Sequence, residues 1–124
     1  MPKAMVIDDS RTIRLILADT LAQLGYDVCQ AGNGKEALAA LQAETEGVGL
    51  ILVDWNMPEM NGLDFVKHVR SDSRFSSVPL MMVTTETEMH QVTRALEAGA
   101  NEYVMKPFTK EIIADKLRIM GVIA

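Results

Sequence analysis

Five short runs of apolar residues alternate along this chain with five longer segments whose apolar residues recur at helical spacing. The run at 50–53 is apolar throughout rather than at every second position, which is typical of a strand buried on both faces of a parallel sheet. The predicted strands span residues 3–7, 27–31, 50–53, 80–83 and 102–105. This alternation predicts an α/β domain in which right-handed crossovers place helices on both faces of the sheet.

The predicted helices begin after residues whose side chains can accept hydrogen bonds from the first free amide groups of a helix. These capping residues are Ser10, Asn33, Thr87 and Thr109, and the pair Asn61–Gly62 opens the third helix. The first helix is predicted over residues 11–24, with an inward face formed by Ile13, Ile16, Leu17, Leu21 and Leu24. With 124 residues, we expect one domain over 1–124 and no separate output domain.

The composition limits the partners and the location of the protein. The net charge of −5 argues against direct binding of nucleic acid and would attract a metal cation. The one cysteine, Cys29, excludes an internal disulfide and is predicted to be a small buried thiol. The apolar stretches are far shorter than the ~20 residues of a membrane span, and no signal peptide precedes the first strand. We therefore expect a cytoplasmic protein that does not bind a membrane.

Charged residues follow three of the predicted strands. Asp8 and Asp9 follow the first strand, Asp54 the third and Lys106 the fifth. Ligands of open α/β sheets bind at the carboxyl ends of the strands, so we expect these groups to meet there. Three converging carboxylates repel one another unless a cation lies between them, and an all-oxygen ligand set favours Mg²⁺ or Ca²⁺. A carboxylate beside such a metal can attack phosphorus, which predicts a magnesium-assisted phosphoryl site.

Two further features fit a phosphoryl site at this edge. Thr84 follows the fourth strand, where its hydroxyl would reach a phosphoryl oxygen. Lys106 precedes Pro107, and a cis peptide bond between them would redirect the lysine side chain.

Taken together, these motifs resemble those of the receiver domains of two-component response regulators, in particular the stand-alone regulators of chemotaxis. The resemblance covers essentially the whole chain, and the motifs are specific in combination and order. They are Asp8-Asp9-Ser10, Asp54 with Met57-Pro58 and Asn61-Gly62, Val83-Thr84, Gly99-Ala100 and Lys106-Pro107-Phe108. The resemblance implies a flavodoxin-like, doubly wound sheet of five parallel strands in the order 2-1-3-4-5, with five helices.

The resemblance also implies roles for individual residues. Asp54 would be the phosphoacceptor, and Lys106 and Thr84 would bind the phosphoryl group. The ligands of Mg²⁺ would be Asp8, Asp9, Asp54 and the backbone carbonyl of Asn56.

A second set of residues would act in signalling. Thr84 and Tyr103 would form a conformational switch, and Asn56 and Glu86 would tune hydrolysis of the acyl phosphate. The phosphodonor would be a histidine kinase or a histidine phosphotransfer protein, and a downstream protein, plausibly in chemotaxis or motility, would bind helix four, strand five and helix five. The protein would act as a monomer, and its only chemistry would be its own phosphorylation and dephosphorylation.

The alternatives are a relay or sink for phosphate, an aspartate-nucleophile phosphatase and a flavodoxin-like cofactor binder. Such phosphatases usually need a second acid two residues after the nucleophile, where this chain has Asn56. Asp8 and Asp9 in the first loop would repel a cofactor phosphate that lacked a metal. One departure from the family is Thr85, which stands where a small residue is common and would narrow access to the phosphoryl site.

Overall fold

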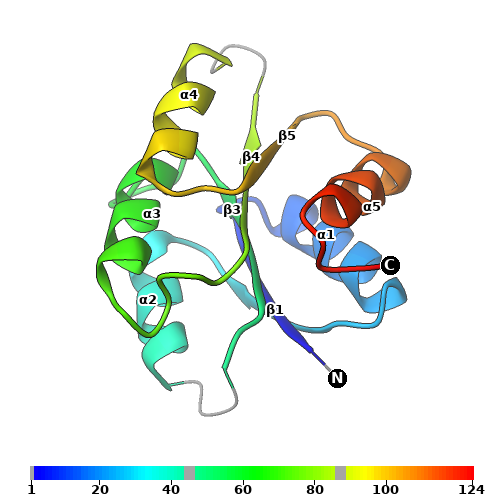
Figure 1. Cartoon of the computed structure of the whole chain (residues 1–124), viewed down its shortest axis with the longest axis horizontal. Helices are drawn as coiled ribbons and strands as arrows, with labels where there is room; N and C mark the ends of the chain where they lie inside the picture. The colour runs from blue at the N-terminus through cyan, green and yellow to red at the C-terminus, as the bar shows by residue number, and fades with distance from the viewer. Residues whose placement is uncertain (1, 44–46, 86–88) are drawn as a thin grey trace.

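The fold is a single five-stranded parallel sheet in the order β2-β1-β3-β4-β5, as predicted (Figure 1). The computed structural model describes residues 2–43, 47–85 and 89–124, without the side chains of 89 and 90. The strands are β1 (Lys3–Ile7), β2 (Asp27–Ala31), β3 (Leu50–Asp54), β4 (Leu80–Thr84) and β5 (Glu102–Met105).

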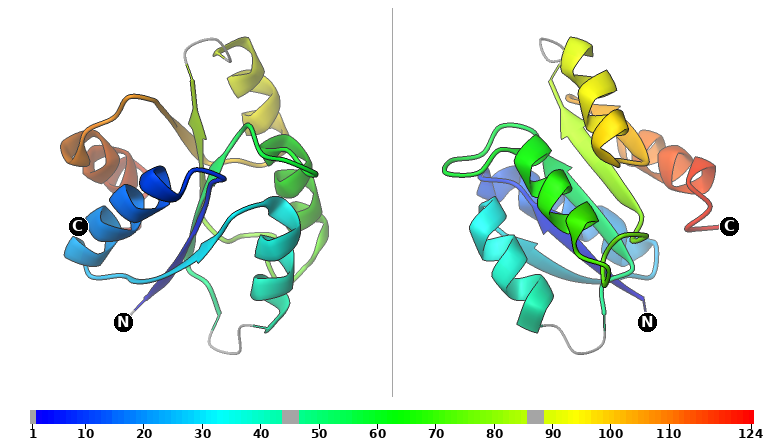
Figure 2. Two further views of the ribbon diagram at one scale, coloured as in Figure 1. Left: turned by 180° about the vertical axis from the view of Figure 1, so that it is seen from behind. Right: turned by 60° about the vertical axis from the view of Figure 1, so that its left-hand side comes forward.

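Two layers of helices cover the sheet. The helices are α1 (Arg11–Gln23), α2 (Gly34–Ala43), α3 (Gly62–Ser71), α4 (Met89–Ala98) and α5 (Lys110–Ile119). Helices α1 and α5 cover one face, and α2, α3 and α4 cover the other, as the views in Figures 1 and 2 agree. Within the described part of the chain, none of the helices has the length and apolar character needed to cross a membrane.

Each layer has its own hydrophobic core. Met5, Ile51 and Met82 pack with α2, α3 and α4 on one face, whereas Val6 and Leu52 pack with α1 and α5 on the other. Every position of β3 and β4 is buried, because both strands have a neighbouring strand on each side and helices on each face. Burial on both faces explains why these segments are apolar throughout.

Side-chain caps begin the helices where the sequence predicts them. Ser10 Oγ accepts a hydrogen bond from the Ile13 amide at 3.3 Å, and Asn33 Oδ1 accepts one from the Glu36 amide at 2.9 Å. Thr109 Oγ1 accepts one from the amide of Ile112 at 3.2 Å. The predicted cap at Thr87 lies outside the described residues.

Some local predictions were wrong. Strands β3 and β4 each extend one residue further, so Asp54 and Thr84 belong to the sheet itself. Ile16, predicted to face inward, is 47% exposed because the buried side of α1 is centred on Leu17 and Leu21. Cys29 is only half-buried, since β2 is an edge strand.

Gly62 allows α3 to begin directly against the end of β3. A Cβ atom at this position would lie 2.5 Å from the backbone oxygen of Asp54 and 3.0 Å from the Cα of Trp55. The Gly62 amide also donates a hydrogen bond to the Trp55 carbonyl at 2.8 Å. The atoms nearest to such a Cβ belong to the backbone, so they cannot turn away as a flexible side chain would.

We expect Gly62→Ala to lower the free energy of unfolding by about 2–3 kcal/mol, because the new methyl group displaces backbone beside Asp54. The matched control is Gly49→Ala, whose Cβ would lie at an ordinary 3.7 Å from the Lys3 carbonyl. Urea unfolding of both variants checks this, and equal stabilities would contradict the steric argument.

Candidate functional site

The side chains of Asp8, Asp54 and Lys106 meet because of the alternation of side chains along parallel strands. Each residue lies two positions after a core residue of the α1 and α5 face: Val6, Leu52 or Val104. Backbone hydrogen bonds between neighbouring strands continue up to the site. The Asp8 amide donates to the Ala31 carbonyl at 3.2 Å, and the Lys106 amide donates to the Thr84 carbonyl at 2.7 Å. The Lys106–Pro107 peptide bond, whose isomer the sequence leaves open, is cis.

The three charged groups are in direct contact. Lys106 Nζ lies 3.2 Å from Asp8 Oδ2 and 3.4 Å from Asp54 Oδ1. The other Asp8 oxygen, Oδ1, accepts a hydrogen bond from the Ser10 amide at 2.8 Å. Asp8 is 1% exposed and Asp54 5%, so one lysine contacts two buried carboxylates.

The electrostatics of this group are unfavourable to a charged Asp54. Burial, reinforced by the charge of Asp8, raises the pKa of Asp54 from 3.8 to about 6, although Lys106 acts in the opposite direction. Burial also disfavours the ammonium of Lys106, but the charges of Asp54 and Asp8 outweigh that cost and raise its pKa. The site therefore holds more negative charge than one lysine balances.

The acidic residues fit a divalent cation. Asp8, Asp9 and Asp54 each offer a carboxylate oxygen, and these oxygens all lie within 4.8 Å of one another. Asp8 and Asp54 are buried while Asp9 is exposed, so a cation would have buried ligands on one side and solvent on the other. An all-carboxylate set with access to water is the chemistry that suits Mg²⁺, which retains several of its water molecules.

The hydroxyl of Thr84 is available to a group bound at this site. Thr84 is 0% exposed, and its Oγ1 makes no hydrogen bond with any residue that the structure describes. A buried hydroxyl without a partner is costly in free energy, so a bound phosphoryl oxygen that accepts its proton would be favoured. This orphaned hydroxyl is the observation that best fits a phosphoryl group to the site.

Tyr103 lies on the same face of the sheet as Thr84. In the parallel pairing of β4 with β5, Tyr103 is opposite Met82, and Met82 is two residues before Thr84. Residues two apart on a strand share a face, so Thr84, Met82 and Tyr103 all face the layer that contains α4. Thr84 and Tyr103 therefore lie on one face of the sheet, with Met82 opposite Tyr103.

The remaining predicted residues lie around the edge of the site. Asn56 is exposed in the loop after β3, Thr85 is half-buried directly after β4, and Glu86 lies outside the described residues. The part played by Thr85 in access to the site stays a prediction.

Arg14 and Met60 also hold the loops around the site, although the sequence gives no sign of this. Arg14 of α1 donates from Nη1 to the backbone carbonyl of Asp8 at 2.6 Å and holds the loop that carries Asp8 and Asp9. Met60 packs so closely on Gly34 that a Cβ at Gly34 would lie 2.8 Å from its sulfur, which ties the loop after β3 to α2. Both contacts join distant segments, and neither leaves a local pattern in the sequence.

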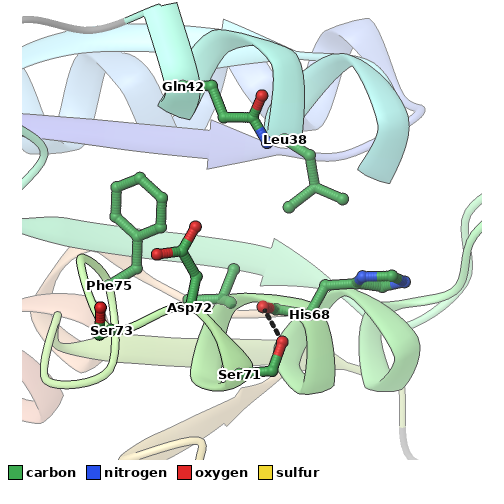
Figure 3. Close-up of a pocket in the computed structure, with 8 residues that line it drawn as sticks. Leu38, Gln42, His68, Ser71, Asp72, Ser73 and Phe75 are labelled. Atoms are coloured by element: carbon green, nitrogen blue, oxygen red, sulfur yellow. Dashed lines mark hydrogen bonds between the residues drawn. The ribbon is translucent and has the colours of Figure 1, made fainter.

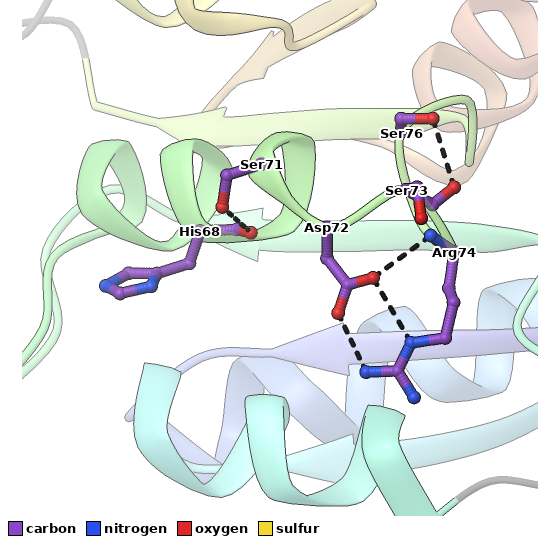
Figure 4. A network of polar contacts seen from close by, with 6 residues as sticks. All are labelled: His68, Ser71, Asp72, Ser73, Arg74 and Ser76. Atoms are coloured by element: carbon purple, nitrogen blue, oxygen red, sulfur yellow. Dashed lines mark hydrogen bonds and ion pairs between the residues drawn. The ribbon is translucent and has the colours of Figure 1, made fainter.

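A cavity of about 470 Å³ lies away from this site, between α2 and the carboxyl end of α3. Leu38 and Gln42 point from α2 toward Asp72 and Phe75 (Figure 3). The carboxylate of Asp72 accepts hydrogen bonds from the Arg74 amide, Nε and Nη2 at 3.0, 3.1 and 2.7 Å (Figure 4). These hydrogen bonds lower the pKa of Asp72 and pair its charge with Arg74.

Comparison with known proteins agrees with the fold and the site. A family model described as the response regulator receiver domain matches residues 4–118. The chain therefore belongs to the response regulator receiver domain family.

Its relatives include stand-alone chemotaxis proteins. The chain is 50% identical over 119 residues to chemotaxis protein CheY1 of Helicobacter pylori, with 95% of each protein covered. It is 47% identical over 116 residues to a CheY homolog of Campylobacter jejuni, covering 93% of this chain and 88% of the relative. The solved structure of CheY4 from Vibrio cholerae matches with a TM-score of 0.88 at 38% identity, covering 96% of this chain and 98% of that one.

At pH 7.5 without metal, we expect the free energy of unfolding of Asp54→Asn to exceed that of the wild type by about 1–3 kcal/mol. The folded pKa of about 6 exceeds the ordinary value of 3.8, so the charged carboxylate costs stability above about pH 6. Well below the ordinary pKa of 3.8, Asp54 is protonated in both the folded and the unfolded chain, and the difference should disappear.

Urea unfolding in a metal chelator at several pH values tests this expectation. Asp27→Asn, an exposed aspartate on β2, is the matched control and should leave stability nearly unchanged. A wild type at least as stable as Asp54→Asn at pH 7.5 would show that Lys106 already balances the charge.

Proposed function

We propose that this protein is a single-domain response regulator of a two-component system, phosphorylated on Asp54. Receiver domains of this kind are signalling proteins rather than classical enzymes. The observation that carries the proposal is a buried Asp54 at the end of β3 beside a buried Thr84 hydroxyl at the end of β4 that has no hydrogen-bond partner among the described residues. The similarity to chemotaxis proteins supports a role in chemotaxis or motility.

The chemistry follows from the positions of the charged groups. A carboxylate oxygen of Asp54 would attack the phosphorus of a phosphohistidine, the P–N bond would break, and the imidazole would leave with the bonding electrons. Lys106, 3.4 Å from Asp54 Oδ1, would pair with the transferred phosphoryl group, and Thr84 would donate a hydrogen bond to it. Mg²⁺ bound by Asp8, Asp9, Asp54 and the carbonyl of Asn56 would neutralise negative charge.

Phosphorylation would then act as a switch. Lys106 and Thr84 would move toward the phosphoryl group, and Tyr103 would follow Thr84 on the shared face of the sheet. The surface of α4, β5 and α5 would bind a downstream protein more tightly in that state. Asn56 and Glu86 would set the lifetime of the acyl phosphate.

The setting of the protein follows from the same proposal. The phosphodonor would be a histidine kinase or a histidine phosphotransfer protein, and the chain would act as a cytoplasmic monomer. Return of phosphate to a phosphotransfer protein is the related alternative, and it differs in where the phosphate goes rather than in the chemistry at Asp54.

We expect acetyl phosphate to add one phosphoryl group to the protein only when Mg²⁺ is present, because Mg²⁺ offsets the crowding of negative charge. Intact-mass measurement with and without Mg²⁺ checks this. Asp54→Asn should gain no mass, while Asp64→Asn, an exposed aspartate on α3, should behave as the wild type. Phosphorylation of Asp54→Asn would place the acceptor elsewhere.

We expect Lys106→Ala to retain phosphorylation on Asp54 but to lose the coupling to β5, because the phosphoryl group would lack its cationic partner. Mass measurement and backbone amide NMR of the phosphorylated protein check both parts. The wild type and Lys67→Ala, which removes an exposed lysine of α3, should show shifts at Tyr103, whereas Lys106→Ala should show them only near β3. Normal shifts at Tyr103 in Lys106→Ala would remove this lysine from the switch.

A further inference from the structure

A compact arrangement around Tyr103 takes no part in the phosphoryl chemistry. Lys116 of α5 places its Nζ 4.5 Å from the centroid of the Tyr103 ring and 3.2 Å from Oε1 of Glu102. The same Oε1 accepts a hydrogen bond from the backbone amide of Tyr103 at 2.9 Å. One carboxylate oxygen therefore holds both the ammonium beside the ring and the backbone that carries the ring. We call the pair of Glu102 and Lys116 the clamp.

The position of the clamp makes its contacts stronger than those of an ordinary surface ion pair. Strand β5 is at the edge of the sheet, with β4 as its one neighbouring strand, and α5 covers one face beside it (Figure 1). The side chains of Lys116 and Glu102 are only 26% and 18% exposed. Attraction between a cation and an aromatic ring increases as both lose contact with water.

We propose that Lys116, held by Glu102, is a positioning residue for Tyr103 that opposes movement of the ring when Asp54 is phosphorylated. This inference rests on the proposed function, in which Tyr103 is the switch residue. Side chains of adjacent residues on a strand point to opposite faces, so a long lysine from α5 is needed to reach both Glu102 and the ring. The clamp thus links the α5 layer to a ring that packs against the opposite core.

Release of the Tyr103 ring from the clamp would affect binding at the phosphoryl site. If the ring must leave the clamp for the phosphorylated state to form, binding at Asp54 and release of the ring are thermodynamically linked. Removing the clamp should therefore tighten the binding of a phosphoryl analogue, by about two- to five-fold for one cation–ring contact. A clamp that only stabilised the fold would change unfolding without changing this affinity.

The experiment uses ¹⁹F NMR of protein labelled with 3-fluorotyrosine. The chain has two tyrosines, and Tyr26→Phe assigns the resonance of Tyr103. Lys116→Met removes the charge and keeps most of the apolar stem, Glu102→Gln releases the lysine, and Lys116→Arg restores a cation beside the ring. Lys110→Met, which removes an exposed lysine from the start of α5, is the matched control.

The first set of spectra is recorded without any phosphoryl analogue. We expect the Tyr103 resonance to shift in Lys116→Met and Glu102→Gln and to stay near the wild-type position in Lys116→Arg and Lys110→Met. Circular dichroism confirms that each variant is folded. An unchanged Tyr103 resonance in folded Lys116→Met would overturn the proposal.

The second set follows titration with beryllofluoride and Mg²⁺, with the fluorescence of Trp55 as a separate measure of binding next to Asp54. We expect Lys116→Met to bind about two- to five-fold more tightly than the wild type and Lys110→Met to bind equally. Equal affinities, or a wild-type Tyr103 resonance that ignores bound beryllofluoride, would overturn the proposal. Absence of binding in every variant would instead count against Asp54 as the acceptor, and the clamp would fail with it.

Discussion

The repulsion among three carboxylates at one edge of the sheet is the interaction on which the site depends. Asp8 and Asp54 are buried beside each other, Asp9 is close by, and Lys106 is the cation that contacts both buried acids. Burial of like charges costs free energy that the hydrophobic cores on both faces must offset. A divalent cation bound between the carboxylates would relieve this cost, whereas a neutral ligand would not.

Packing around Asp8 and Asp54 keeps these carboxylates from moving apart to relieve the repulsion. Gly62 packs against the backbone of Asp54, Arg14 holds the carbonyl of Asp8, and β3 and β4 are buried at every position. Carboxylates on a loose loop would simply turn toward water. Here Asp8 and Asp54 are buried close together, and a cation bound between them would relieve their repulsion.

The order of elements and the residues at the strand ends could be predicted from the sequence because both depend on local patterns. Apolar runs identify β3 and β4, and the acids at the carboxyl ends of β1 and β3 identify the edge where ligands bind. The exposure of Ile16 and the contacts of Arg14 and Met60 could not be predicted, since they depend on how distant segments pack. The partner of Lys116 is a similar case: the sequence shows a lysine on a helix, and only the fold places it beside Tyr103.

The alternation of side chains along the strands places Asp54 and Thr84 on different faces at this edge of the sheet. Asp54 continues the series of residues that faces α1 and α5, whereas Thr84 on the next strand continues the series that faces α4. A group that contacted both side chains would therefore bridge the two faces of the sheet.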